Sequence, residues 1–284
     1  MPLKMYLEKE TGPLAGIANI IAVAAGKGGV GKSSVTVNLA LALQRLGRNV
    51  GILDADVYGP SLRKMLPEDS MPTQQGQKII PAIAMGIRVI SMAYFRKENE
   101  AAVVRAPIAN GVISQFINNV EWGPLDYLLI DFPPGTGDVQ LTLSQQANLT
   151  GAVMVTTPQD VAVLDVRKAM SMFDQVKVPV VGVVENMSYY YHQKTDETLY
   201  LFGKGGGEKL ARECGVPFLG AIPIDPDLCR SCDRGESLFA AHEESIAAKA
   251  FVCLAEHLEK HVEEMKLVSA RSLQNFELIW KEMA

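Results

Sequence analysis

The most informative stretch of this sequence is Gly26-Lys27-Gly28-Gly29-Val30-Gly31-Lys32-Ser33. It follows an apolar run, Ile20–Ala25, that is typical of a buried strand. It leads into Ser33–Leu46, where apolar residues recur at helical spacing. The order is therefore strand, G-x-x-x-x-G-K-S, helix, which is the context that a phosphate-binding loop requires. A glycine-rich turn without a ligand is the alternative, but every position of the loop and both flanks fit phosphate binding.

The residue types in this loop suit phosphate chemistry. Glycines let backbone N–H groups approach phosphate oxygens because no Cβ stands in the way. The N-terminus of the following helix adds the positive end of its dipole. We expect Lys32 to contact the β- and γ-phosphates and Ser33 to ligate Mg²⁺. The whole segment from Gly26 through Ser34 is predicted to bind nucleotide.

Two further predicted strands end in aspartates. Val50–Asp54 continues into an Asp-Ala-Asp sequence, and Leu125–Asp131 is an apolar strand with the Walker B pattern. The carboxyl ends of parallel strands are where open α/β sheets bind ligands. We expect Asp54 and Asp131 to serve Mg²⁺, directly or through its water, and Asp56 to orient or deprotonate the attacking water. A helix-capping turn is the alternative for the Asp-Ala-Asp sequence, but the phosphate-binding loop upstream favours the functional interpretation.

The chain after this point alternates between strands and helices. A turn rich in proline and glycine, Phe132–Asp138, has free backbone N–H groups suited to sensing a γ-phosphate. The alternation predicts an α/β fold, a mostly parallel sheet with helices on both faces. The predicted elements are strands at Gly151–Thr156, Val180–Glu185, Phe218–Ile222 and Ala101–Val104, a hairpin or edge strands over Lys78–Met92, and helices over Pro107–Val120, Asp160–Val176, Ile246–His261 and Met265–Ala284.

Composition limits the function classes. Hydrophobic residues make up 48% and charged residues 21% of the 284 residues, an ordinary globular balance. The net charge of −5 argues against DNA binding driven by overall charge, and no apolar run approaches a membrane span. We therefore expect no nucleic-acid and no membrane partner. Met1–Gly12 lacks the apolar core of a secretory signal, and four cysteines in a chain of this length indicate a reducing cytoplasm rather than a disulfide scaffold.

The chain divides into three predicted segments. These are a lead-in over residues 1–16, a P-loop ATPase domain over 17–261 and a C-terminal helical extension over 262–284. Helices that lie on membranes are typically rich in lysine and arginine on their polar face, whereas the extension carries charges of both signs. We therefore expect the extension to dock on the core or on a partner subunit.

The phosphate-binding loop carries a second lysine, Lys27, that a plain P-loop does not need. The K-G-G-V-G-K-S pattern resembles the "deviant" Walker A ATPases, a group with the SIMIBI-type P-loop fold that includes nitrogenase iron protein and the Min and Par positioning ATPases. In that superfamily the extra lysine crosses a dimer interface to the partner's nucleotide. The resemblance therefore implies a homodimer that encloses two ATP molecules, with Lys27 acting in catalysis beside Lys32 and Asp56.

Two other elements resemble one branch of this superfamily, the Mrp/ApbC-type iron–sulfur cluster carriers. They are the D-x-P-P-G-T-G-D sequence that begins at Asp131 and the F-G-x-G-G-G element at Phe202–Gly207. The branch implies an ATP-hydrolysing carrier that binds iron–sulfur clusters and transfers them to apoproteins. The alternative is a Par- or Min-like positioning ATPase that acts on DNA or membrane.

The resemblance also implies how the base is held. In this superfamily an asparagine at the position of Asn186 recognises adenine, and a later loop that contains Pro223 closes over the base. An ordinary turn residue is the alternative for Asn186, because asparagine favours turns generally.

The expected cargo site departs from the family pattern. The family usually places a Cys-Pro-x-Cys between its E-N-M-S and F-G-x-G-G-G elements, whereas Tyr189–Leu201 contains no cysteine here. The single C-x-x-C pairs Cys229 with Cys232. Thiolates at this spacing can share a metal, so two subunits could supply the four ligands of a [4Fe–4S] cluster. A redox-active pair, two unremarkable thiols or a family member without a cluster are the alternatives. Cys214 and Cys253 lie in apolar helical contexts and are expected in the core.

Overall fold

The centre of the molecule is an eight-stranded sheet with the strand order β12-β9-β8-β1-β7-β2-β6-β5. The computed structural model describes residues 14–57, 59, 61–95 and 106–282. Neighbouring strands of the sheet are parallel except for the hairpin of β5 and β6 at one edge, which confirms the predicted sheet. The strands are β1 (Ile17–Ala25), β2 (Val50–Asp54), β5 (Ala82–Ala84), β6 (Ile87–Ser91), β7 (Leu125–Asp131), β8 (Gly151–Thr156), β9 (Val180–Glu185) and β12 (Phe218–Ala221).

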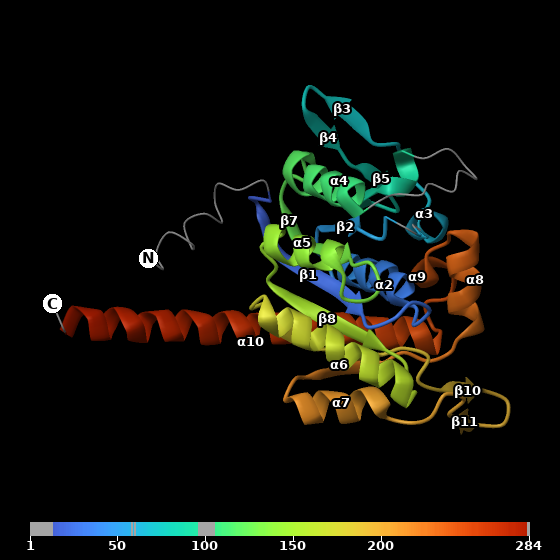
Figure 1. Cartoon of the computed structure of the whole chain (residues 1–284). Helices are drawn as coiled ribbons and strands as arrows, with labels where there is room; N and C mark the ends of the chain where they lie inside the picture. The colour runs from blue at the N-terminus through green and yellow to red at the C-terminus, as the bar shows by residue number, and fades with distance from the viewer. Residues whose placement is uncertain (1–13, 58, 60, 96–105, 283–284) are drawn as a thin grey trace.

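Helices cover both faces of this sheet (Figure 1). Side chains of β1 show the two faces: Ile21 and Val23 join one buried cluster with helices α2 and α10, while Ile20 and Ala22 join another with α4, α5, α6 and α7. Alternate residues of a strand point to opposite faces, so burial on both sides requires the continuous apolar run of β1. The helices are α2 (Lys32–Arg45), α3 (Leu62–Met65), α4 (Ala106–Asn119), α5 (Asp138–Gln146), α6 (Asp160–Gln175), α7 (Gly206–Cys214), α8 (Pro226–Arg234), α9 (Leu238–Ala241) and α10 (Ile246–Glu282), with the 3₁₀ turn η2 (Met92–Phe95).

Two small antiparallel ribbons lie outside the main sheet. One pairs β3 (Thr73–Gln75) with β4 (Lys78–Ile80), and the other pairs β10 (Tyr190–His192) with β11 (Glu197–Leu199). Strand β4 of the first ribbon and the β5–β6 hairpin confirm the strands that were predicted over Lys78–Met92. The second ribbon lies within Tyr189–Leu201, the interval that contains no cysteine. The strand predicted at Ala101–Val104 lies outside the described residues.

The C-terminal helix differs from the prediction. A single helix, α10, covers the region for which two helices were predicted. Neither glycine nor proline stands between His261 and Met265, so nothing in the sequence ends the helix there. Val262 is buried, and this anchors the junction to the core. The boundary expected between residues 261 and 262 therefore lies inside a helix, whose end extends past the sheet in Figure 1. Among the described residues, no helix is both long and apolar enough to cross a membrane.

Candidate functional site

Strand register brings three polar side chains into one row. Asp131 at the end of β7 lies beside Val23 of β1 on one side and beside Asp54 of β2 on the other. Asp54 in turn lies beside Ser91 of β6. Because these strands are parallel, their carboxyl ends share the edge of the sheet where β1 runs into the phosphate-binding loop.

The loop itself is held by close packing. Gly31 has a φ of 79°, which favours glycine, and a Cβ there would lie 2.2 Å from Nδ2 of Asn186. A Cβ on Gly26 would lie 2.1 Å from the backbone of Asp165 in α6. Nδ2 of Asn186 donates a hydrogen bond of 2.9 Å to the Val30 carbonyl. The loop conformation therefore depends on glycine at two positions and on a brace from the β9–β10 connection.

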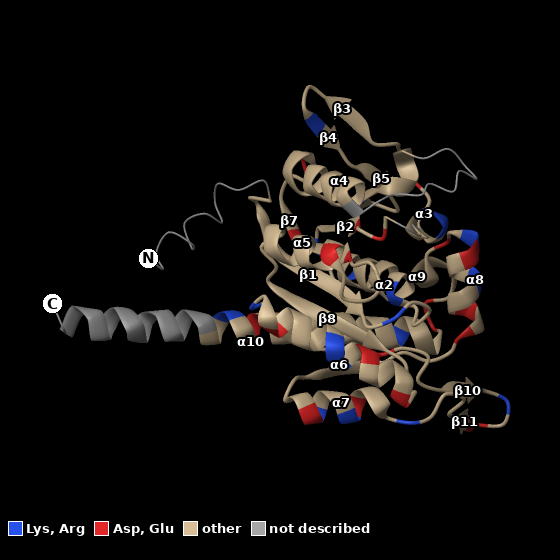
Figure 2. Cartoon of the chain, viewed as in Figure 1, with Lys and Arg blue, Asp and Glu red and all other residues tan. Residues whose placement is uncertain are grey.

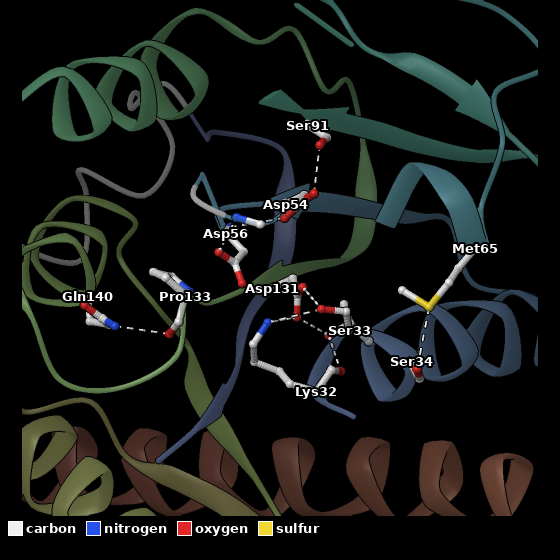
Figure 3. A network of polar contacts seen from close by, with 12 residues as sticks. Lys32, Ser33, Ser34, Asp54, Asp56, Met65, Ser91, Asp131, Pro133 and Gln140 are labelled. Carbon is white, nitrogen blue, oxygen red and sulfur yellow. Dashed lines mark hydrogen bonds and ion pairs between the residues drawn. The ribbon is translucent and has the colours of Figure 1, made fainter. Parts of the chain in front are cut away.

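The Asp131 carboxylate is the centre of a buried network (Figure 3). Its Oδ1 accepts hydrogen bonds from Lys32 Nζ at 2.7 Å and from Thr36 Oγ1 at 2.8 Å. Its Oδ2 accepts a hydrogen bond from Ser33 Oγ at 2.6 Å. Lys32 is only 7% exposed, so this ion pair is shielded from solvent. The structure thus brings the predicted residues Lys32, Ser33 and Asp131 into direct contact, and the hydroxyl and carboxylate oxygens are of the kind that Mg²⁺ prefers.

Asp54 lies next to this network. It is buried, and its carboxylate accepts hydrogen bonds from Ser91 Oγ at 2.7 Å and from the Asp56 amide at 3.1 Å. Burial, and secondarily the neighbouring charge of Asp131, raise the pKa of Asp54 from 3.8 to about 7. A cation held between the two carboxylates would favour their charged forms. The pair is therefore suited to bind a divalent ion with its water shell.

Asp56 lies between the phosphate-binding loop and the turn that follows β7. It is half-buried, and its Oδ1 accepts a hydrogen bond from the Gly59 amide at 3.2 Å. Asp56 lines both the main cavity of the site and a smaller one of about 250 Å³ beside Pro133 and Pro134. Gln140 fixes that turn, because its Nε2 donates to the Pro134 carbonyl at 2.7 Å.

The main cavity has a volume of about 810 Å³, within the range of ligand sites. The phosphate-binding loop forms one part of its wall, and Asn186 and Pro223 form another. Lys27 also lines the cavity, is half-exposed, and has no hydrogen bond or ion pair within the part of the chain that the structure describes. All predicted phosphate-binding and base-binding residues except Gly26 and Val30 therefore line one space.

Both cysteines of the C-x-x-C line the same cavity from α8. Cys229 is exposed, whereas Cys232 is half-buried and lies 3.8 Å from Asn38 Nδ2. Burial raises the pKa of the Cys232 thiol. Among the described residues, no group of three or more histidine, cysteine, aspartate or glutamate side chains is arranged to hold a metal ion. One chain thus presents two thiols, on one helix, to this cavity.

The prediction for Cys253 is wrong, since this side chain is exposed. Helical periodicity explains the error: Phe251, Leu254 and Leu258 face the core, and Cys253 falls on the opposite side of α10. Cys214 is half-buried against the core.

Three residues of the site were not predicted from the sequence: Thr36, Ser91 and Gln140. Thr36 follows Lys32 by one helical turn and is a polar residue on an otherwise apolar face, so its spacing was a usable signal. Ser91 and Gln140 had no such signal, because their roles depend on strand register and on the path of the turn after β7.

Comparison with known proteins places the chain in a family. A family model described as "ParA: NUBPL iron-transfer P-loop NTPase" matches residues 16–259. The "Iron-sulfur cluster carrier protein" of Aquifex aeolicus is 46% identical over 251 residues, which cover 87% of this chain and 69% of that relative. These matches confirm the predicted resemblance to the iron–sulfur carrier branch.

Solved structures agree. A nucleotide-binding protein from Archaeoglobus fulgidus, in complex with ADP and with cobalt, is 39% identical, with a TM-score of 0.70 over 83% of this chain and 96% of that one. The cell division ATPase MinD of Pyrococcus furiosus is 23% identical, with a TM-score of 0.60 over 86% of this chain and 99% of its own, and shows the shared fold. The chain therefore belongs to the ParA family of P-loop NTPases, in its NUBPL iron-transfer group.

Proposed function

We propose that this protein is an ATP-hydrolysing carrier that binds an iron–sulfur cluster and transfers it to apoproteins. The observation that carries the nucleotide part is the contact of Lys32 and Ser33 with the buried Asp131 carboxylate at the edge of an 810 Å³ cavity. The name shared by relatives such as the Aquifex aeolicus protein supports the carrier part.

Within this proposal, the loop residues hold the phosphates of ATP. Backbone N–H groups of Gly26–Ser34 surround the phosphate oxygens, and the Lys32 ammonium exchanges Asp131 for the β- and γ-phosphates. Ser33, Asp131 and Asp54 would hold Mg²⁺, partly through water, which fits the oxygen donors that the network provides. Bound Mg²⁺ would neutralise phosphate charge.

Asp56 is proposed to position and deprotonate the attacking water. Its place between the two cavities supports this role, because a water there would lie between the loop and the turn after β7. Lys27 is proposed to act on the nucleotide of a partner subunit in a homodimer. Its half-exposed side chain, without a partner among the described residues, is free for such a contact.

Asn186 and Pro223 are proposed to hold the adenine base. Both line the cavity that the loop borders. Nδ2 of Asn186 donates a hydrogen bond to the Val30 carbonyl. Recognition of the base would therefore use the second N–H of this amide or its Oδ1.

Cys229 and Cys232 are proposed as the cluster ligands, with two subunits supplying four thiolates to a [4Fe–4S] cluster. The oxygen and aromatic side chains of the β10–β11 hairpin are poor ligands for such a cluster. All four cysteines are free thiols, which fits the expected cytoplasmic location.

The Par- or Min-like alternative has weaker support. The MinD protein of Pyrococcus furiosus shares the fold of this chain at only 23% identity. The iron–sulfur cluster carrier protein of Aquifex aeolicus is 46% identical. Figure 2 shows Lys and Arg interspersed with Asp and Glu along α7 and α8, unlike the basic stripe of a nucleic-acid-binding surface.

Anaerobic reconstitution with iron and sulfide, followed by iron and acid-labile sulfide analysis, tests the proposal. We expect a labile cluster that is lost in Cys229→Ser/Cys232→Ser, together with Mg²⁺-dependent ATP hydrolysis. Unchanged iron, sulfide and visible absorption in the double variant would refute the ligand assignment. A wild-type protein that hydrolyses ATP but never takes up iron would refute the carrier role and leave the ATPase.

A further inference from the structure

The C-x-x-C lies in the wall of the nucleotide cavity rather than on a separate surface. Cys229 and Cys232 both line the cavity that contains the phosphate-binding loop. They are three residues apart on α8, so they share one helix face with Cα atoms about 5 Å apart. The two thiols can therefore act together on one small ligand inside this space.

A short chain of contacts joins Cys232 to the loop. Its sulfur lies 3.8 Å from Asn38 Nδ2, and the same nitrogen donates to the Ser34 carbonyl at 2.9 Å. Ser34 directly follows Ser33, so the thiol borders the start of the helix on which the phosphates are proposed to rest.

Helix α8 has little room to move away from this position. At its start, Asp225 accepts hydrogen bonds from the Asp227 amide at 2.8 Å and from the Ala247 amide of α10 at 3.3 Å. At its end, a Cβ on Gly235 would lie 2.7 Å from Pro67 Cδ. A nucleotide and a ligand on the thiols would therefore enter one cavity whose α8 wall is anchored at both ends.

We propose that Cys229 and Cys232 form a thiol site for soft metal ions inside the nucleotide cavity, and that bound nucleotide closes it. The inference rests on the proposed nucleotide binding. It adds that a bound nucleotide weakens the binding of a metal ion to the thiols, and that a bound metal ion weakens the binding of nucleotide. Linkage requires this effect to be reciprocal, so each lowers the affinity of the other by the same factor. A carrier built in this way binds its cargo in the nucleotide-free state.

Alkylation by iodoacetamide, followed residue by residue with mass spectrometry, tests the access step. Saturating ADP with Mg²⁺ is expected to slow modification of Cys229 and Cys232 by about tenfold or more and to leave Cys253 unchanged. Cys253 is an internal control, because it is exposed on α10 and does not line the cavity. Lys32→Ala should abolish the protection while the thiols remain.

Cadmium, a soft ion with a thiolate absorption band, tests reciprocity in a Cys214→Ser/Cys253→Ser background. We expect ADP to weaken Cd²⁺ binding and Cd²⁺ to weaken ADP binding by equal factors. The further variant Cys229→Ser/Cys232→Ser should lose both the band and the coupling. Unchanged alkylation rates and independent affinities, in a protein shown by titration to bind ADP, would overturn the inference and leave the ATPase assignment standing. A protein that does not bind ADP would overturn both.

Discussion

The two sides of the nucleotide cavity hold their side chains in different ways. At the sheet edge, both oxygens of Asp131 are hydrogen-bonded and the carboxylate is fully buried. On the part of the wall formed by α8, Cys229 is exposed, and Cys232 makes a weak sulfur contact with Asn38 Nδ2 at 3.8 Å. The difference indicates that the side chains of the proposed ATP centre are already held close to one another by hydrogen bonds, whereas the thiols on α8 keep their ligand capacity unused. Substitutions should therefore have large effects on the first side and small structural effects on the second.

Removing the lysine of the buried network should have the largest effect. Lys32→Ala is expected to weaken ATP binding by about a hundredfold or more, because it removes a charge-assisted contact with the phosphates and leaves Asp131 without its cation. Titration with a fluorescent ATP analogue measures this. Lys27→Ala, in the same loop but half-exposed, should bind normally. An equal loss of ATP affinity in Lys32→Ala and Lys27→Ala would show that the two lysines do not differ in their contribution to ATP binding.

Asp56→Ala should separate binding from chemistry. We expect near-normal ATP affinity and hydrolysis slowed by about 10²–10⁴-fold, the usual contribution of a general base. Phosphate release under saturating ATP measures the rate. Asp160→Ala is a suitable control, because Asp160 is exposed and lines neither cavity. Full turnover by Asp56→Ala would exclude this residue from the reaction.

The proposed dimer can be tested by mixing variants. Lys27→Ala should bind ATP but not hydrolyse it, if its charge acts on the partner's phosphates. Mixed dimers of Lys27→Ala and Asp56→Ala subunits should then regain one competent site, with Asp56 acting within its own subunit. Phosphate release should rise on mixing, and subunit exchange needs independent proof. No recovery despite proven exchange would indicate that Lys27 acts within its own subunit.

The raised pKa of Asp54 predicts a pH dependence of stability without metal or nucleotide. The native pKa, about 7, exceeds the ordinary value of 3.8, so between these values the native state holds more protons than the unfolded chain. The free energy of unfolding should therefore fall as the pH rises through this window, by up to about 1.4 kcal/mol per pH unit. Urea unfolding measures it, and Asp54→Asn should flatten the slope. If the free energy of unfolding of Asp54→Asn falls with pH as steeply as that of the wild type, the pH dependence comes from other groups.

The smallest effect is expected at Thr36. Thr36→Val keeps the shape of the side chain but removes one donor to Asp131, at a cost of about 1–2 kcal/mol in the free energy of unfolding. Thr142→Val is the matched control. The Thr142 hydroxyl donates to the carbonyl four residues earlier on α5, and the Thr36 hydroxyl lies near the equivalent carbonyl on α2, but Thr142 is only half-buried and donates to no carboxylate among the described residues. Equal losses in the two variants would mean that the Asp131 contact adds no stability.

The parts of the molecule that could be predicted are those encoded locally. The phosphate-binding loop, the strands ending at Asp54 and Asp131 and the helix that begins at Asp160 follow from short patterns of residue type, and the structure confirms them as structural elements. Ser91 could not be predicted, because its contact with Asp54 depends on the register of β6 against β2. The continuity of α10 was missed because separate helices were predicted before and after residues 262–264, although no residue there ends a helix. Nothing in the sequence around Cys229 indicated that α8 would face the loop.

The brace between Asn186 and the loop has a consequence for how the protein can evolve. Asn186 holds the Val30 carbonyl, and the space beside it is too small for any side chain at Gly31. A mutation that altered base preference at Asn186 would also loosen the loop that holds the phosphates. Neither position can change alone, so a lineage that changed its nucleotide would have to begin at a base-binding position outside this brace, at Pro223. Laboratory selection for a different base should accumulate its first substitutions there.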